Sequence, residues 1–147
     1  MKYLFLFIFT FSFYLASAQV SFNTGNVRLD ADLNAINTQA SLNLSYFNKD
    51  MQLTYGVSER KLNYMHVSLH MAPGEIFLSL EIFRLGKVPL DRVLEVYRTH
   101  RSKGWGVIAK QLGIKPGSAE FHQLKQNASS KKSKGFAKKH KHKKKHK

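Results

Sequence analysis

Between Phe47 and Gln126, glycine and proline divide the sequence into short segments that carry apolar residues at helical spacing. Phe47, Met51 and Tyr55 recur at every fourth position before Gly56. Apolar residues three or four positions apart form one face of a helix, and glycine is typical of a helix C-terminus. The pattern predicts a mostly α fold, a compact bundle of about six short helices. The expected helices span residues 45–55, 59–71, 75–85, 89–101, 105–112 and 119–126. The third is apolar nearly all round and is expected at the centre of the bundle.

Residues 19–46 form an N-terminal segment whose secondary structure the pattern leaves open. Residues 27–34 and 40–46 alternate apolar and polar side chains, and a period of two favours half-buried strands. An N-terminal β-hairpin is therefore one interpretation, although an isolated two-stranded hairpin is marginally stable. A helix over residues 29–40 is the other. The helical domain itself is expected to cover residues 47–126.

The first 18 residues have the pattern of a signal peptide. Lys2 precedes an apolar run from Tyr3 to Leu15, which is followed by Ala16, Ser17 and Ala18. The run is shorter than the ~20 residues of a membrane-spanning helix, and small residues precede a signal-peptidase cleavage site. We expect a mature chain that begins at Gln19, has no transmembrane span and is exported to the periplasm or secreted. The absence of cysteine favours a bacterial envelope over an animal extracellular space.

Residues 127–147 are expected to form a disordered tail rich in lysine and histidine. The chain has 24 lysine and arginine residues; ten lie in this tail and one is Lys2, which leaves 13 beside 9 acidic residues in the body. A segment so rich in like charges cannot bury enough apolar surface to offset chain entropy. The tail lysines are Lys131, Lys132, Lys134, Lys138, Lys139, Lys141, Lys143, Lys144, Lys145 and Lys147.

A polycationic tail attracts polyanions without regard to their sequence. The expected partners are nucleic acid, lipopolysaccharide and acidic polysaccharide, and Phe136 adds at most a shallow apolar contact. Metal binding is an alternative, because histidine is a common metal ligand. Its candidate ligands are His140, His142 and His146 in the tail, and His66 and His70 in the second expected helix. An extracellular nucleic-acid binder is a further alternative.

The block from Gly104 to Lys125, GWGVIAKQLGIKPGSAEFHQLK, admits three interpretations. Its helix, turn and helix pattern is superficially similar to a DNA-binding helix-turn-helix, yet the second helix offers few side chains suited to base edges. A ligand surface around Trp105, His100 and His122 is a second interpretation. The favoured one is internal packing, with Trp105 as a core anchor. The residues assigned to structure are Gly104, Trp105, Gly106, Gly113, Pro116 and Gly117.

This block, with LTYGVS upstream and VLEVYRTHRSKGWG leading into it, resembles an uncharacterised family of exported bacterial small helical proteins. In that family a small helical domain ends in a GWGxIAKxLGIKPGSxEFHxLK-type block, to which this chain is similar. The resemblance covers residues 45–125. It implies export and a helical fold. It carries no catalytic or binding residues to this chain, and the tail lies outside it.

Nothing in the sequence marks an enzyme or a cofactor. Two pairs of carboxylates, Asp30 with Asp32 and Glu75 with Glu81, lie close together in the chain, but no nucleophile elbow or phosphate-binding glycine loop accompanies them. We therefore expect an exported, non-enzymatic binding or scaffold protein whose tail contacts anionic envelope or extracellular polymers.

Overall fold

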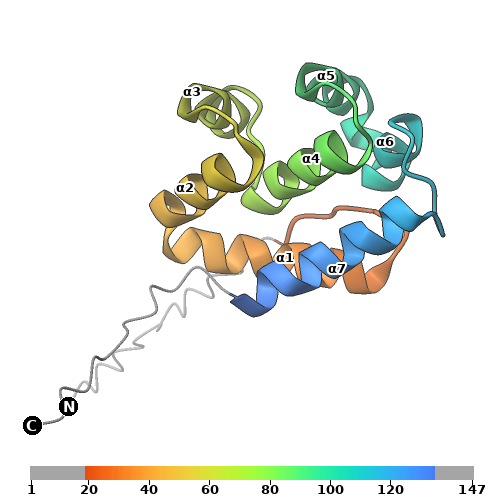
Figure 1. Cartoon of the computed structure of the whole chain (residues 1–147), viewed down its shortest axis with the longest axis horizontal. Coiled ribbons are helices and arrows are strands. Elements are labelled where there is room, and N and C mark those ends of the chain that lie inside the picture. The colour runs from red at the N-terminus through yellow and green to blue at the C-terminus, as the bar shows by residue number, and fades with distance from the viewer. Residues whose placement is uncertain (1–18, 135–147) are drawn as a thin grey trace, which may run out of the picture.

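The computed structural model of the chain describes residues 19–134 (Figure 1). Within this range seven α-helices are joined by short loops, and there is no β-strand. The α-helices are α1 (Val27–Leu42), α2 (Leu44–Tyr55), α3 (Glu59–Asn63), α4 (Pro73–Leu85), α5 (Leu90–His100), α6 (Trp105–Gln111) and α7 (Ala119–Lys134). A π-helical turn, η1 (Tyr64–Ser68), extends α3, and a 3-10 turn, η2 (Arg101–Lys103), follows α5. The prediction of a mostly α fold is confirmed.

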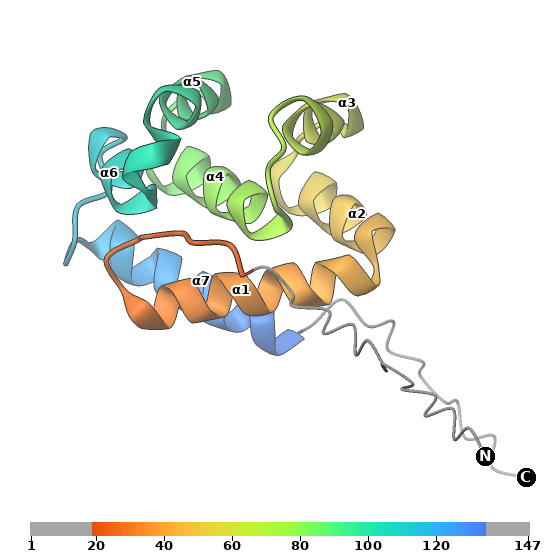
Figure 2. The same cartoon turned by 180° about the vertical axis from the view of Figure 1, so that it is seen from behind.

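The central helix of the bundle is α4. It contacts α1, α2, α5 and α7, and every residue from Ile76 to Ile82 is buried. Figure 1 and Figure 2 show α1 and α7 side by side on one side of α4, with α3 and α5 on the other. A helix that is apolar nearly all round belongs in such a position because no face of it prefers water.

The prediction of an N-terminal β-hairpin is wrong, and the helical alternative describes this segment. Residues 27–42 form one helix, α1, in which Leu29, Leu33, Ile36 and Ala40 are buried. These residues recur at intervals of three and four, so they form one helical face that packs against α4 and α7. The helix begins where the side chain of Asn26 accepts a hydrogen bond from the Leu29 backbone N–H, at 2.9 Å. That N-cap satisfies one of the amides that a helix start leaves free.

The last helix is longer than predicted, so the expected tail boundary at residue 127 is wrong. Instead of ending at Gln126, α7 continues to Lys134. Leu124 and Ala128 are both buried in the core and lie one turn apart, which carries the apolar stripe past the expected boundary. Residues 135–147 of the expected tail and residues 1–18, where a signal peptide is expected, lie outside the described residues.

The segment before α1 is packed into the bundle although it is not helical. Phe22 is buried, and two amides at the start of α6 donate to this segment: Trp105 N–H to the Phe22 carbonyl at 2.8 Å, and Gly106 N–H to the Asn23 carbonyl at 2.9 Å. In Figure 2 the segment runs back over α1 toward α6. The folded part of the chain therefore begins within a few residues of Gln19.

None of the helices in residues 19–134 combines the length and the apolar character that crossing a membrane requires.

Candidate polyanion-binding surface

The helix α7 joins the packed domain to the lysine-rich end of the chain. It begins at Ala119, and the hydroxyl of the preceding Ser118 accepts a hydrogen bond from the Phe121 backbone N–H at 3.1 Å. Glu120 lies in the first turn and the basic residues lie in the last turn. Acidic residues near the N-terminus and basic residues near the C-terminus both interact favourably with the helix dipole. The pKa of Glu120 is lowered by hydrogen bonds with its own backbone and with Ser118.

Two lysines that the sequence assigned to a disordered tail are held within the fold. Lys131 donates to Asp50 on α2, and Lys132 donates to Asp32 on α1. The backbone carbonyl of Lys132 also accepts a hydrogen bond from the Gln39 side chain at 2.9 Å. These contacts attach the end of α7 to α1 and α2. Lys134, by contrast, is exposed.

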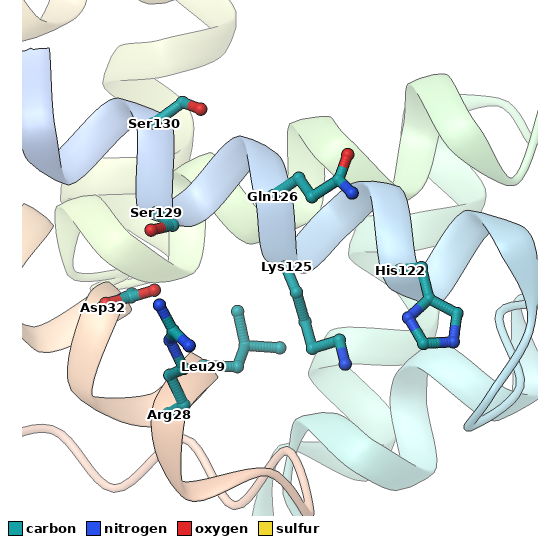
Figure 3. A pocket seen from close by; sticks show the side chains of 8 residues that line it. All are labelled: Arg28, Leu29, Asp32, His122, Lys125, Gln126, Ser129 and Ser130. Carbon is teal, nitrogen blue, oxygen red and sulfur yellow. The ribbon is translucent and has the colours of Figure 1, made fainter.

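A groove of about 540 Å³ lies between α1 and α7 (Figure 3). Its lining comprises Arg28, Leu29 and Asp32 from α1, and His122, Lys125, Gln126, Ser129 and Ser130 from α7. Figure 3 shows Arg28 and Lys125 extending into the open space from the two helices. The carboxylate of Asp32 is neutralised by Lys132. Arg28 and Lys125 therefore leave the groove with a net positive charge.

A second, smaller hollow of about 250 Å³ adjoins α7 on the side of α2 and α4. Glu81 is buried at this place and accepts hydrogen bonds from Tyr55, from Arg84 at 2.7 Å and from Asn127 at 2.6 Å. Burial, and next the charge of Glu81, raise the pKa of Tyr55 far above its ordinary value. Because donors from three elements meet one carboxylate, the cluster links α2, α4 and α7.

The carboxylates weighed as acid–base pairs are not brought together as pairs. Glu75 accepts hydrogen bonds from Tyr97, from Trp105 and from the Ala72 backbone, whereas Glu81 belongs to the separate cluster just described. Asp30 accepts from the backbone and the hydroxyl of Thr24, and Asp32 is bound to Lys132. Asp30 and Asp32 were expected on one strand face, but two positions along a helix point to nearly opposite sides.

Trp105 lies in the core, which is the environment that a packing role requires. Its side chain is 3% exposed, its ring stacks on that of Tyr97 at a centroid distance of 5.2 Å, and its indole N–H donates to Glu75 at 3.3 Å. A buried indole must find such an acceptor for its N–H. The ligand surface proposed around Trp105 is therefore not present at that ring.

The two glycines that flank Trp105 allow the N-terminal segment to approach α6. Gly104 has φ of 86°, and a Cβ on it would lie 2.5 Å from the Cβ of Asn23. A Cβ on Gly106 would lie 2.9 Å from the carbonyl oxygen of Thr24. Both distances are shorter than van der Waals contact, so only glycine fits without moving the segment.

The turn between α6 and α7 uses the remaining residues that the sequence assigned to structure. Gly113 and Gly117 have positive φ values of 91° and 81°, which glycine adopts at little cost. Ile114 is buried, and its N–H donates to the Ala109 carbonyl at 2.9 Å. This is the folding back of an apolar residue onto the last helical turn that the LGI sequence predicts. Pro116 lies exposed in the same turn.

The two histidines expected near Trp105 lie in different places. His100 contacts Thr99 through Nδ1 at 2.7 Å and Gln111 through Nε2 at 3.1 Å. His122 lies on α7 and lines the groove with Arg28 and Lys125. The part that His122 could play in binding is thus tied to the groove and not to the tryptophan.

His66 and His70 do not lie one turn apart on a single α-helix, which is the spacing that the predicted metal pair requires. η1 is a π-helical turn in which the Leu69 N–H donates to the Tyr64 carbonyl, and His70 lies beyond it with φ of 53°. His66 contacts the Asn48 side chain at 3.1 Å, and burial lowers its pKa. Within residues 19–134 no three histidine, cysteine, aspartate or glutamate side chains are grouped to hold a metal. The tail histidines lie outside the described residues, so metal binding by them stays a prediction.

Sequence reasoning missed the groove because its walls lie far apart in the chain. Arg28 was treated only as a polar position in an expected strand, and Lys125 only as part of the GWG block. A helical interpretation of residues 27–42 would have placed Arg28 at the edge of the buried face, but the pairing of α1 with α7 is a tertiary contact. No spacing within the sequence indicates that pairing.

Comparisons of the chain with protein-family models, with curated proteins and with solved structures found no match in any of the three.

Proposed function

We propose that this is an exported, non-enzymatic binding protein whose lysine-rich C-terminal end contacts anionic polymers of the bacterial envelope or extracellular space. The observation that carries the proposal is the distribution of charge at the end of α7. Lys131 and Lys132 are bound to Asp50 and Asp32. The following residues, 135–147, contain seven more lysines and no acidic residue. These seven lysines have no acidic neighbour in their own segment.

The physical basis of this binding is electrostatic. A polyanion carries condensed counterions, and lysines that neutralise its charges release them into solution. Affinity then depends steeply on salt and little on the sequence of the polymer. Lysine suits such contacts because its ammonium group is a compact charge on a flexible stem.

The helical domain serves in this proposal as the carrier of the cationic segment. The attachment of α7 to α1 and α2 anchors the start of that segment to a packed core. Glu75 and Glu81, the two carboxylates of the central helix α4, accept hydrogen bonds from side chains of other helices. Carboxylates whose hydrogen-bond partners come from within the protein favour a structural role over a catalytic one.

The proposal is tested with the chain from Gln19 and with a tail-neutral variant of the same length. In the tail-neutral variant the seven lysines beyond the described residues are replaced by glutamine, namely Lys138, Lys139, Lys141, Lys143, Lys144, Lys145 and Lys147. Replacement is preferable to truncation at Ser130, because truncation would also remove the lysines that hold α7 to Asp32 and Asp50. Both proteins are titrated with duplex DNA, heparin and vesicles of anionic phospholipid over a range of salt concentrations.

We expect the wild-type chain to bind all three polyanions, with affinity that falls steeply as salt rises. The tail-neutral variant should lose most of this affinity while keeping its helical circular dichroism. Vesicles of zwitterionic lipid are the control for apolar attachment, and neither protein should bind them. Equal affinity of the two proteins for every polyanion would overturn the proposal.

A further inference from the structure

We infer that the groove between α1 and α7 is a second binding site, located on the folded domain, and that it takes an acidic saccharide. This inference rests on the proposed function in one respect: it assumes that the partner is an anionic polymer. The residues are different, because the groove is lined by residues of α1 and by residues 122–130 of α7, and none of the seven tail lysines lines it. The chemistry that would be recognised is a sulfate or carboxylate group flanked by sugar hydroxyls.

Two cations face this groove without a carboxylate partner. Among residues 19–134, neither Arg28 nor Lys125 forms an ion pair, and Figure 3 shows both side chains reaching into the groove. The Lys125 ammonium lies 5.2 Å from the Phe121 ring centroid, a contact with the face of the ring that leaves its N–H donors available. A guanidinium on the α1 wall and an ammonium on the α7 wall can each bind an anionic group of one ligand in the groove.

The single carboxylate in the groove does not cancel this charge. The side chain of Asp32 is 4% exposed, and its Oδ1 accepts from Lys132. The charge of Asp32 is therefore already compensated before any ligand enters. A carboxylate can also accept hydrogen bonds from hydroxyl groups, which a saccharide supplies.

The rest of the polar lining suits hydroxyl groups. The side chains of Gln126, Ser129 and Ser130 form no hydrogen bond with the other described residues, although all three line the groove. Amides and hydroxyls both donate and accept. Together with the cations they provide the mixture that an acidic sugar needs, since such a sugar carries one anionic group among several hydroxyls. The volume of about 540 Å³ falls in the range of roughly 300 to 1,000 Å³ that is typical of small-molecule sites.

The lining disfavours single-stranded nucleic acid as the occupant. Sites for single strands combine a positive groove with aromatic side chains on which the bases stack. No phenylalanine, tyrosine or tryptophan lines this groove, and His122 is its only ring. An anionic sugar needs no stacking partner for its charged group, so the observations favour the saccharide.

The test uses the tail-neutral variant of the chain from Gln19, so that the lysines beyond residue 134 do not mask the groove. Isothermal titration calorimetry measures binding of a heparin-derived tetrasaccharide and of an oligogalacturonate of equal length. The first probe carries sulfates and carboxylates, and the second carries carboxylates alone, so the two distinguish the source of the anionic group. A thymidine oligonucleotide is the nucleic-acid probe.

The groove variant is Arg28→Gln with Lys125→Gln, and the matched control is Arg98→Gln with Lys110→Gln. Both pairs remove the same charge, and the control residues are exposed on α5 and α6. Arg28 is exposed and Lys125 is partly exposed, so neither substitution should disturb the core, which Trp105 fluorescence verifies. We expect the groove variant to weaken binding of at least one saccharide by about tenfold or more. The control should change the affinity by less than about twofold.

Three results would overturn the inference. The first is equal loss in the groove variant and its control, which would mean diffuse electrostatic attraction. The second is tighter binding of the oligonucleotide than of either saccharide. The third is the absence of saccharide binding by the tail-neutral chain. If the wild-type chain still binds polyanions in that third case, the groove inference fails while the tail proposal stands.

Discussion

The ammonium group of Lys132, near the end of α7, donates a hydrogen bond to the buried carboxylate of Asp32 on α1, 100 residues earlier in the chain. The side chain of Asp32 is 4% exposed and that of Lys132 is 37% exposed. A buried carboxylate that loses its cation keeps its desolvation cost without compensation. This pair therefore makes the last turn of α7 a structural part of the domain.

Replacing Lys132 by glutamine should lower the free energy of unfolding by about 1 to 3 kcal/mol, because Asp32 then stays buried without its partner. Urea unfolding followed by the fluorescence of Trp105, the single tryptophan, measures the change. Lys134→Gln is the matched control, since Lys134 is exposed; its effect should stay within roughly 0.5 kcal/mol. Equal effects of the two substitutions would show that the Lys132–Asp32 pair does not hold α7.

Replacing Gly106 by alanine should destabilise the domain by about 1 to 3 kcal/mol, a range typical of overpacking. The added Cβ would lie 2.9 Å from the Thr24 carbonyl oxygen, so the segment before α1 must shift away from α6. Gly113→Ala is an informative comparison, since the φ of Gly113, 91°, is itself unsuited to alanine but no atom lies within 4 Å of the added Cβ. In nuclear magnetic resonance spectra, Gly106→Ala should move the amide signals of residues 22–24 and Gly113→Ala should leave them in place. Unmoved signals in Gly106→Ala would contradict the close approach.

The stability of the domain should fall as the pH drops below the unfolded-state pKa of histidine, about 6.5, in part because of His66. Burial lowers the pKa of His66 in the folded protein, so the unfolded chain takes up a proton first and is favoured by acid. The contribution is complete above pH 6.5 and is lost as the pH falls through the lower, folded-state pKa. His66→Gln should flatten the dependence of the unfolding free energy on pH between 7 and 5. His70→Gln, which removes an exposed histidine, is the control, and a flattening of equal size there would count against this role of His66.

Much of the fold follows from local spacing. The helices from α2 to α6 lie close to their predicted positions. The buried face of a short amphipathic helix can be recognised from the spacing of its apolar residues, and glycines mark where such helices end. The pattern in the segment that forms α1 indicated strands instead, because asparagine and aspartate alternate there with leucine and alanine. Neither asparagine nor aspartate favours strands, and the signal for a helix was the recurrence of Leu29, Leu33, Ile36 and Ala40 at intervals of three and four.

The end of α7 and the groove depend on contacts that the sequence does not display. A run of lysines indicates a solvated tail when it is considered alone. Asp32 and Asp50 change that outcome only because the fold brings α1 and α2 beside α7. The groove has the same origin, since Arg28 and Lys125 are 97 residues apart and line one groove only because α1 packs beside α7.

The salt dependence of binding to duplex DNA tests the proposed function most directly. The logarithm of the observed binding constant is plotted against the logarithm of salt concentration for the wild-type and the tail-neutral chains. Each lysine that contacts a phosphate contributes about 0.9 to the magnitude of this slope, so the seven substitutions should lower it by several units, up to about 6. A slope of the same magnitude in both chains would show that the lysines beyond residue 134 do not carry the binding, and the central claim would be wrong.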